Sequence, residues 1–258
     1  MPGVLLLIAA LAGCGGGSSP AAPSPLPTSS GANPCDALSL SGNIATAITN
    51  GTACSTANSP VVLVNLYDSG GIFSGSCSGT VISTRAVLTA AHCLIGGTAS
   101  VKIYLDTGIP LIPAQAFTAA PNYQESDPTS LDVGVIRFAN DIGRPPMPLL
   151  VSRDARVGEA AVIAGWSAEK TLRAGGTTIT VVGPTLLQTD VIANASAVCP
   201  GDSGGPLLLS QGGAWAIAGV TSAATTTACS FGTSYYANIR NSAIRSFIIG
   251  LVKDAATR

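Results

Sequence analysis

Glycine and proline interrupt this chain so frequently that they constrain its fold more than any other feature. The 258 residues include 30 glycines and 17 prolines, while 47% of all residues are hydrophobic and only 10% are charged. Frequent turn residues favour many short strands, and the apolar content is large enough to bury a sizeable core. The sequence therefore predicts an all-β globular protein.

The charged residues show no concentration of either sign. The formal net charge is -1, and the 12 lysines and arginines are scattered along the chain. A nucleic-acid-binding surface needs a basic patch or stripe, so we expect no nucleic-acid partner. The longest apolar stretch, residues 4–12, is much shorter than the roughly 18 residues that suggest a membrane-spanning helix.

The N-terminus carries the apolar segment of a secretory signal. This segment ends in Leu-Ala-Gly-Cys, with Cys14 last, and the ending resembles a bacterial lipobox. The resemblance implies that residues 1–13 are a signal peptide and that cleavage before Cys14 is followed by lipid attachment to that cysteine. An ordinary secretion signal is the alternative, because residues 1–3 lack the lysine or arginine that usually opens a signal peptide.

Residues 15–34 consist almost entirely of Gly, Ser, Pro and Ala. This composition buries too little apolar surface to offset the entropy of ordering, so it predicts an extended tether. We divide the rest of the chain into the tether with a candidate propeptide, residues 14–47, and a folded domain, residues 48–258. The only expected membrane contact is the lipid at Cys14.

Six cysteines remain when Cys14 is set aside, and an even number in an exported chain indicates disulfides. Spacing alone does not choose among the pairings, but bridges beside the histidine and serine motifs described next would hold their loops rigid. We therefore predict three bridges: Cys77 to Cys93, Cys199 to Cys229, and Cys35 to Cys54. A metal site is not expected, because the cysteines form no close pair in the sequence.

Three segments supply a base, an acid and a nucleophile. His92, the only histidine, lies in Thr-Ala-Ala-His-Cys, and Ser203 lies in Gly-Asp-Ser-Gly-Gly-Pro. Between them, Asp132 opens an apolar, β-branched run that predicts a buried strand. Histidine suits removal of a serine proton near neutral pH, and a carboxylate can fix the histidine tautomer. Asp127 is the competing acid, but it precedes a proline in a polar, turn-rich stretch.

The chain from about Ile48 to its end resembles the chymotrypsin-like serine proteases of the trypsin superfamily, in which histidine, aspartate and serine occur in this order. Gly165 and Trp166 after an apolar strand add to the resemblance, as do apolar residues at helical spacing near the C-terminus. The C-terminal residues are Ile244, Phe247, Ile248 and Leu251, behind Asn241 and Ser242. The resemblance implies two six-stranded antiparallel β-barrels with the active site in the cleft between them, and a C-terminal helix.

The glycine before Asp202 lets the backbone approach a substrate closely. We expect the N–H groups of Gly201 and Ser203 to face the oxygen that becomes negative during acyl transfer, as an oxyanion hole. His92 would take the Ser203 proton and later return it to the leaving amine, while Asp132 accepts a hydrogen bond from the other ring nitrogen.

By resemblance, the primary specificity pocket is set by Ala197, Ala224 and Ser234. Ser222 is expected to hydrogen-bond around the acid and the substrate backbone. None of these residues is acidic, so a buried lysine or arginine of the substrate would have no partner there. We therefore expect this pocket to accept small or medium apolar side chains of the substrate.

Ile48 begins Ile-Thr-Asn-Gly, which resembles the mature start of the family. Many members become active when cleavage releases an isoleucine or valine amine that pairs with the acid before the serine, here Asp202. We hypothesise cleavage between Ala47 and Ile48, with the new ammonium pairing with Asp202 and ordering the oxyanion loop. The alternative is a plain turn before the first strand. The bridge from Cys35 to Cys54 would keep the propeptide attached after cleavage.

The sequence thus predicts an exported serine endopeptidase that acts on polypeptides through an acyl-enzyme, with no cofactor and no metal. We expect a monomer that is either an envelope lipoprotein or secreted. Two other function classes stay open: an inactive relative that serves as an envelope binding module, and an esterase on the same scaffold. Fluorophosphonate labelling of the serine separates an enzyme from a binding module.

Overall fold

The computed structural model describes residues 33–40, 42–43, 48, 50–127, 129–166, 170–191, 195–225 and 229–258. The predicted signal peptide, the lipidation site Cys14, the tether up to residue 32 and Ala47 lie outside the described residues. Within the described residues, no helix is long and apolar enough to cross a membrane.

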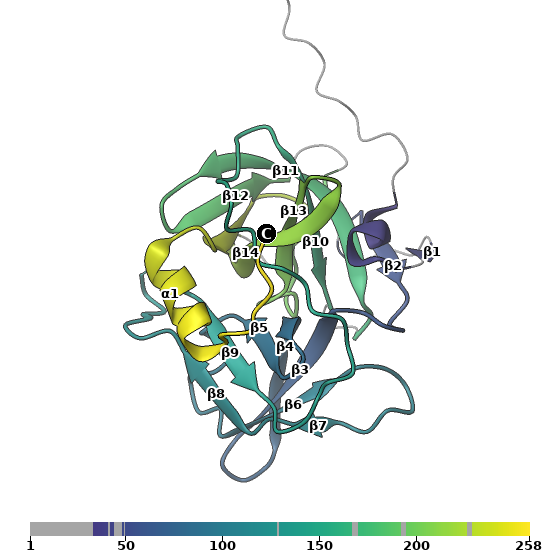
Figure 1. Cartoon of the computed structure of the whole chain (residues 1–258), viewed down its shortest axis with the longest axis vertical. Helices are drawn as coiled ribbons and strands as arrows, with labels where there is room; N and C mark the ends of the chain where they lie inside the picture. Colours follow the sequence, from purple (N-terminus) through teal and green to yellow (C-terminus); the bar gives the residue numbers. More distant parts are fainter. Residues whose placement is uncertain are drawn as a thin grey trace, which may run out of the picture. The chain divides into compact units, whose positions relative to one another are not determined.

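The first of two antiparallel sheets contains the histidine and aspartate segments. Its strands are β3 (Val61–Tyr67), β4 (Phe73–Ser83), β5 (Ala86–Thr89), β6 (Ser100–Tyr104), β7 (Ile112–Pro113), β8 (Ala116–Ala119) and β9 (Gly134–Arg137). They pair in the order β7-β6-β3-β4-β5-β9-β8 (Figure 1). The β-branched and leucine residues of β3 are buried almost throughout, as expected of a strand with neighbours on both sides.

The second sheet contains the serine segment and closes on itself. Its strands are β1 (Gly42–Asn43), β2 (Thr52–Cys54), β10 (Ala160–Gly165), β11 (Arg173–Val182), β12 (Leu186–Asp190), β13 (Pro206–Gln211), β14 (Ala214–Ala224) and β15 (Thr233–Asn238). The order is β1-β2-β11-β10-β13-β14-β15-β12, and β12 also pairs with β11. That additional pairing makes a ring of β10 to β15, which removes the unpaired sheet edges.

The predicted architecture of two antiparallel barrels is confirmed, with differences in detail. The second barrel is a closed six-stranded ring to which β1 and β2 are added along the edge of β11. The first barrel has the two-residue strand β7 beyond the six expected, and no pairing among the described residues joins β7 to β8. The strand predicted behind Asp132 begins slightly later than expected, at Gly134.

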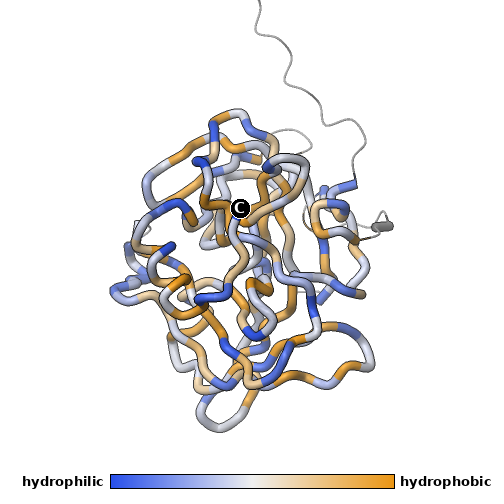
Figure 2. Tube along the Cα trace, viewed as in Figure 1, coloured by the Kyte–Doolittle hydropathy of each residue, from blue (hydrophilic) through white to orange (hydrophobic). Residues whose placement is uncertain are grey.

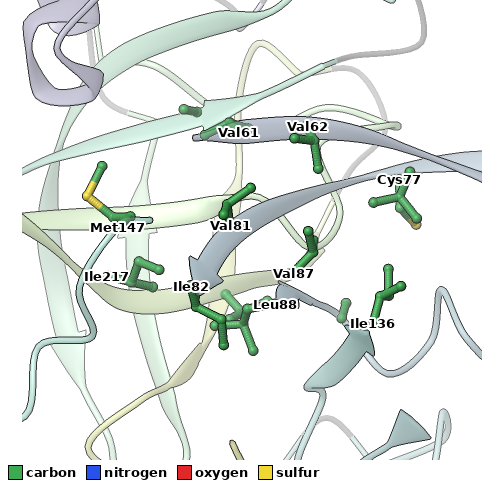
Figure 3. Packing of buried hydrophobic residues seen from close by; sticks show 14 of the residues in the cluster. Val61, Val62, Cys77, Val81, Ile82, Val87, Leu88, Ile136, Met147 and Ile217 are labelled. Carbon is green, nitrogen blue, oxygen red and sulfur yellow. The ribbon is translucent and has the colours of Figure 1, made fainter. Parts of the chain in front are cut away.

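One hydrophobic cluster extends through both barrels. It includes Val61, Val81 and Leu88 of the first barrel together with Leu208 and Ile217 of the second. Figure 3 shows Ile217 of β14 near Met147 and Ile82, so residues far apart in the sequence share this core. Hydrophobic stretches follow the strands of both barrels in Figure 2. Burial of this shared surface therefore stabilises both barrels together.

The predicted C-terminal helix is confirmed as α1 (Ser242–Leu251). Asn241 caps it, since the Asn241 side chain accepts hydrogen bonds from the N–H groups of Ala243 and Ile244. Ile244 and Ile248 face the core, and α1 packs against β9 of the first barrel (Figure 1). The chain thus returns to the first barrel after it has completed the second.

The folded part of the chain also includes residues before Ile48. A 3-10 helix, η1 (Pro34–Leu38), buries Cys35 and Leu38 in the large hydrophobic cluster. The predicted bridge from Cys35 to Cys54 is formed, with a Cα–Cα distance of 5.6 Å. The segment assigned to the tether and propeptide therefore contributes Cys35, Ala37, Leu38 and Leu40 to the core.

Replacing Asn241 by alanine should lower the free energy of unfolding by about 1 kcal/mol, because two N–H groups of α1 lose their acceptor. Urea denaturation followed by circular dichroism measures this change. The matched variant Asn241→Asp keeps a side-chain oxygen at the cap and loses only the hydrogen bond from the Asn241 amide to the Pro184 carbonyl at 3.0 Å, so it should lose less stability than Asn241→Ala. Equal losses in both variants would contradict the capping role.

Candidate active site

His92 and Asp132 meet because the strands that carry them are neighbours. His92 follows the end of β5 and Asp132 precedes β9, and these strands pair with Thr89 opposite Gly134. The Nδ1 atom of His92 lies 2.8 Å from an Asp132 carboxylate oxygen. The His92 backbone N–H also donates to this carboxylate, at 3.0 Å. The predicted pair is therefore placed together by the sheet register.

Ser222 of β14 completes the hydrogen bonding of the acid. Its hydroxyl donates to the Asp132 carboxylate at 2.6 Å, so the carboxylate receives hydrogen bonds from both barrels. The Asp132 side chain is 3% exposed and the His92 side chain 25% exposed. A carboxylate accepts only, so the Nδ1 atom that faces it carries the proton. The Nε2 atom of His92 is thereby left as the basic nitrogen.

The Ser203 loop packs directly against the residues that precede His92. Gly204 follows the serine with a φ of +82°, and a Cβ added there would lie 2.2 Å from the Thr89 hydroxyl and 2.9 Å from the Ala90 nitrogen. Only glycine permits this approach. The two loops therefore lie against each other through Gly204.

The backbone N–H groups around Ser203 fall into two sets, those that donate within the protein and those that do not. Asp202, Gly204 and Gly205 donate theirs to carbonyls of the protein, at 2.8 to 3.0 Å. Among the hydrogen bonds of the described residues, the N–H groups of Gly201 and Ser203 are not used. Gly201 has a φ of +97°, a conformation that glycine adopts far more easily than other residues. The Gly201 and Ser203 N–H groups are the two predicted for the oxyanion hole, and that role stays a prediction.

A pocket of about 130 Å³ lies beside Ser203. Its lining residues are Val198, Cys199, Pro200, Ser203, Thr221, Ser222, Ala223 and Ala224. It is somewhat smaller than the roughly 150 Å³ cavity that holds a benzene molecule, so it suits one small or medium side chain. Ser222 and the predicted wall residue Ala224 take part in it.

The other two predicted pocket residues are buried. Ala197 is 2% exposed and Ser234 is 1% exposed, and neither belongs to the set that lines the pocket. Ser234 instead hydrogen-bonds to the fully buried phenol of Tyr236, whose hydroxyl also contacts Thr189 at 3.1 Å. The role of Ala197 and Ser234 in the primary specificity pocket stays a prediction, and Ser234 lies opposite the lining residue Ala224 in the pairing of β14 with β15.

Asp202 is completely buried beneath the serine turn. One of its oxygens accepts the Cys199 N–H at 2.8 Å, and its carboxylate occupies the space that a side chain at Gly165 would need. Burial of Tyr236 raises the pKa of its phenol, and the nearby Asp202 charge adds to this shift. The observed packing thus explains why glycine precedes Trp166.

Ile48 is also completely buried, in the core cluster of the second barrel. The residues after it are held by hydrogen bonds from the Asn50 side chain to the Ala195 carbonyl at 3.2 Å and from Ser196 to the Asn50 carbonyl at 3.3 Å. A turn at Asn50 leads into β2, as the alternative of a plain turn before a strand expects. The burial of Ile48 is equally compatible with its proposed role after cleavage. Cleavage before Ile48 stays a proposal.

The predicted bridge from Cys77 to Cys93 is formed next to His92, with a Cα–Cα distance of 6.4 Å. The predicted pairing of Cys199 with Cys229 is not among the two bridges formed by the described residues, and it stays a prediction. The Cys77, Cys93 and His92 side chains form a compact cluster of metal-ligating atom types. The two sulfurs form a disulfide, and His92 Nδ1 is hydrogen-bonded to Asp132. These three atoms are therefore not available to a metal.

Asp127, the competing acid, serves a local turn. Its carboxylate accepts hydrogen bonds from the Thr129 hydroxyl at 2.7 Å and the Thr129 N–H at 2.8 Å, in an exposed position. These hydrogen bonds lower the pKa of Asp127 below its usual value. The geometry therefore assigns the contact with His92 to Asp132 alone.

Two residues near the site carry no signal in the sequence. Tyr123 has a pKa raised mainly by burial, and then by the charges of Asp132 and Glu125. Its phenol is therefore neutral beside the Asp132 carboxylate. Ser78 of β4 donates its backbone N–H to the Ser203 carbonyl at 2.7 Å. Neither residue belongs to a recognisable motif, because only the fold brings them to the site.

The chain matches a known protein family over most of its length. A family model described as trypsin matches residues 48–248. The chain belongs to the trypsin family. Members of this family place their histidine, aspartate and serine in the order seen here, between two barrels.

The relatives found among known proteins come from insects and snakes. A chymotrypsin of Phaedon cochleariae is 32% identical over 178 residues, which cover 56% of this chain and 63% of the relative. Phenoloxidase-activating factor 3 of Holotrichia diomphalia is 26% identical over 194 residues, or 57% and 55% of the two chains. The chain thus spans less than two thirds of the length of these relatives.

The fold is also found among solved structures. An HL collagenase structure superposes with a TM-score of 0.63 at 19% sequence identity, covering 75% of this chain and 93% of that chain. The likeness at this identity concerns the two-barrel fold and not the substrate.

Proposed function

We propose that this chain is an exported serine endopeptidase in which Ser203 is the nucleophile, His92 the general base and Asp132 the orienting acid. The observation that carries the proposal is the buried Asp132 carboxylate. It holds Nδ1 of the only histidine at 2.8 Å, while the serine loop packs against the residues before that histidine. Membership of the trypsin family supports a peptidase.

The reaction proceeds by two acyl transfers. Ser203 Oγ attacks the scissile carbonyl and gives its proton to His92 Nε2, which then passes the proton to the leaving amine. Water repeats the sequence on the acyl-enzyme. Asp132 keeps its negative charge throughout, and the Ser222 hydroxyl and both His92 N–H groups lower the cost of burying that charge.

The N–H groups of Gly201 and Ser203 bind the oxyanion of each tetrahedral intermediate. Support comes from the turn geometry, in which neighbouring N–H groups are used within the protein and these two are not, among the described residues. Removal of a single such donor in a serine protease typically lowers kcat by about 10² to 10³. The backbone thus supplies charge stabilisation without a cofactor.

The substrate preference follows from the pocket beside Ser203. The residues that line it include Val198, Ala223 and Ala224, and none of the lining residues is acidic. An ammonium or guanidinium buried there would lack a counter-charge, which disfavours lysine and arginine. We therefore propose cleavage after small or medium apolar residues.

Activation is a further part of the proposal. Cleavage between Ala47 and Ile48 would release an ammonium that pairs with the buried Asp202 and orders the oxyanion loop. Support comes from the burial of Ile48 and from the hydrogen bonds that hold Asn50 against residues 195–196. The bridge from Cys35 to Cys54 would keep the released segment attached.

Export and anchoring rest on the N-terminal sequence and the disulfides. Two bridges formed in the structure suit an oxidising compartment. The lipobox-like ending at Cys14 supports a lipid anchor of a bacterial envelope, whereas the relatives reported above are from insects and snakes. Mass spectrometry of the mature N-terminus tests the anchor separately from the activity.

Ser203→Ala should abolish casein hydrolysis and fluorophosphonate labelling while leaving the fold intact, because the nucleophile is removed and no core contact is lost. Labelling followed by peptide mapping identifies the modified residue. A processed wild-type protein that is not labelled at Ser203 would favour the binding module. Labelling without peptide hydrolysis, together with ester hydrolysis, would favour the esterase.

The two aspartates provide a matched control for this test. Asp132→Asn should lower kcat by about 10⁴-fold, because the amide no longer fixes the Nδ1–H tautomer. Asp127→Asn, at the exposed turn, should leave kcat unchanged. Comparable effects of the two substitutions would contradict the assignment of the acid.

A peptide-library profile of the processed enzyme should show alanine or valine before the cleaved bond, favoured over arginine by at least about 100-fold. The matched variant Val198→Ala enlarges the pocket and should shift the preference toward larger apolar residues. A wild-type preference for lysine or arginine would overturn the proposed specificity.

N-terminal sequencing of the active enzyme should find Ile48. A non-reducing gel should show one species and a reducing gel two, because the disulfide from Cys35 to Cys54 joins the two pieces. Ala47→Asp should prevent self-processing if the small pocket performs it. Full activity of a chain that is intact at this position would contradict the activation step.

A further inference from the structure

Ser78 is a fully buried polar residue that connects the two barrels beside the nucleophile. Its hydroxyl donates to the Gly201 carbonyl at 2.9 Å and accepts the Trp166 N–H at 2.8 Å. Its backbone N–H donates to the Ser203 carbonyl at 2.7 Å, and its carbonyl accepts the Thr89 hydroxyl at 2.8 Å. All hydrogen-bonding groups of this residue are therefore directed at the serine turn, at Thr89 of β5 or at Trp166.

The positions of these contacts along the serine turn carry the argument. The Gly201 carbonyl belongs to the peptide group between residues 201 and 202, and the Ser203 carbonyl belongs to the one between 203 and 204. These two peptide groups flank the one that carries the Ser203 N–H. By holding both, Ser78 sets the direction of that N–H relative to the Gly201 N–H.

The turn needs such a restraint because its first residue is glycine. Gly201 has a φ of +97° and no side chain to limit rotation of the peptide group that follows it. The Ser78 hydroxyl is the side-chain donor that reaches this carbonyl. Since the hydroxyl also accepts from Trp166, its own proton is directed toward Gly201.

We propose that Ser78 is a positioning residue that preorganises the oxyanion hole of this enzyme. Ser78 touches neither the substrate nor the reacting atoms, and acts through the peptide groups of residues 201 to 204. The inference rests on the proposed function and adds a contribution from β4 that the catalytic motifs do not contain.

Ser78→Ala is the test, measured on the processed enzyme with a chromogenic peptide that has alanine before the cleaved bond. We expect kcat to fall by about 10- to 100-fold with little change in KM, less than the loss of an oxyanion donor because both N–H groups remain. The affinity for a peptide boronic acid, whose tetrahedral adduct places an oxygen in the hole, should fall by a similar factor.

Ser59→Ala is a matched control. Ser59 is 1% exposed, and its hydroxyl donates to the Val61 carbonyl at 2.9 Å and accepts the Val61 N–H at 3.0 Å. This variant also loses a buried hydroxyl with two backbone hydrogen bonds, but none of them reaches the serine turn. The midpoint temperature of thermal unfolding should fall in both variants. The kcat and the affinity for the boronic acid should fall only in Ser78→Ala.

Equal kcat values for the two variants would overturn the positioning role. If Ser78→Ala does not fold, Ser78→Thr decides, since it retains the hydroxyl and should keep kcat within about threefold of wild type. A folded threonine variant with a larger loss would count against the proposal. A wild type that neither hydrolyses peptides nor reacts with fluorophosphonate would instead refute the proposed function, and this role with it.

Discussion

The Asp132 carboxylate is almost entirely removed from water, and a buried carboxylate is stable only where donors surround it. The donors are the backbone N–H and Nδ1–H of His92 and the hydroxyl of Ser222. The first two belong to the first barrel and the third to β14 of the second. Satisfying one charge therefore fixes the histidine ring and also ties the two barrels together.

The serine loop is fixed by steric constraints as well as by hydrogen bonds. A side chain at Gly204 would collide with Thr89 and with the Ser78 carbonyl, and one at Gly205 would lie 2.2 Å from the Ala164 carbonyl. The close approach at Gly204 brings the serine loop against the first barrel, where the Ser78 N–H donates to the Ser203 carbonyl at 2.7 Å. The rigidity that an oxyanion hole needs thus comes from close backbone packing, with Ser78 as the polar link.

Much of the fold could be predicted, since its signals are local. The β-branched run of β3, the capped apolar pattern of α1 and the glycine and proline turns each act within a few residues. The role of η1 could not be predicted this way. Burial of η1 depends on distant strands, because its Cys35 and Leu38 lie in the large hydrophobic cluster together with residues of both barrels. Such packing depends on the shapes and volumes of side chains that are distant in the sequence, and a local sequence pattern contains no information about them.

The sequence by itself determined the chemistry available to this protein: a single imidazole, a serine between glycines, and an acid before a buried strand. The tertiary structure decided which acid serves, because the pairing of β5 with β9 brings Asp132 to His92 while Asp127 closes its own turn. It also decided that Ser78 holds the serine turn. Hydrogen bonds act over about 3 Å, so residues far apart in sequence cooperate only after sheet register and core packing have brought them together.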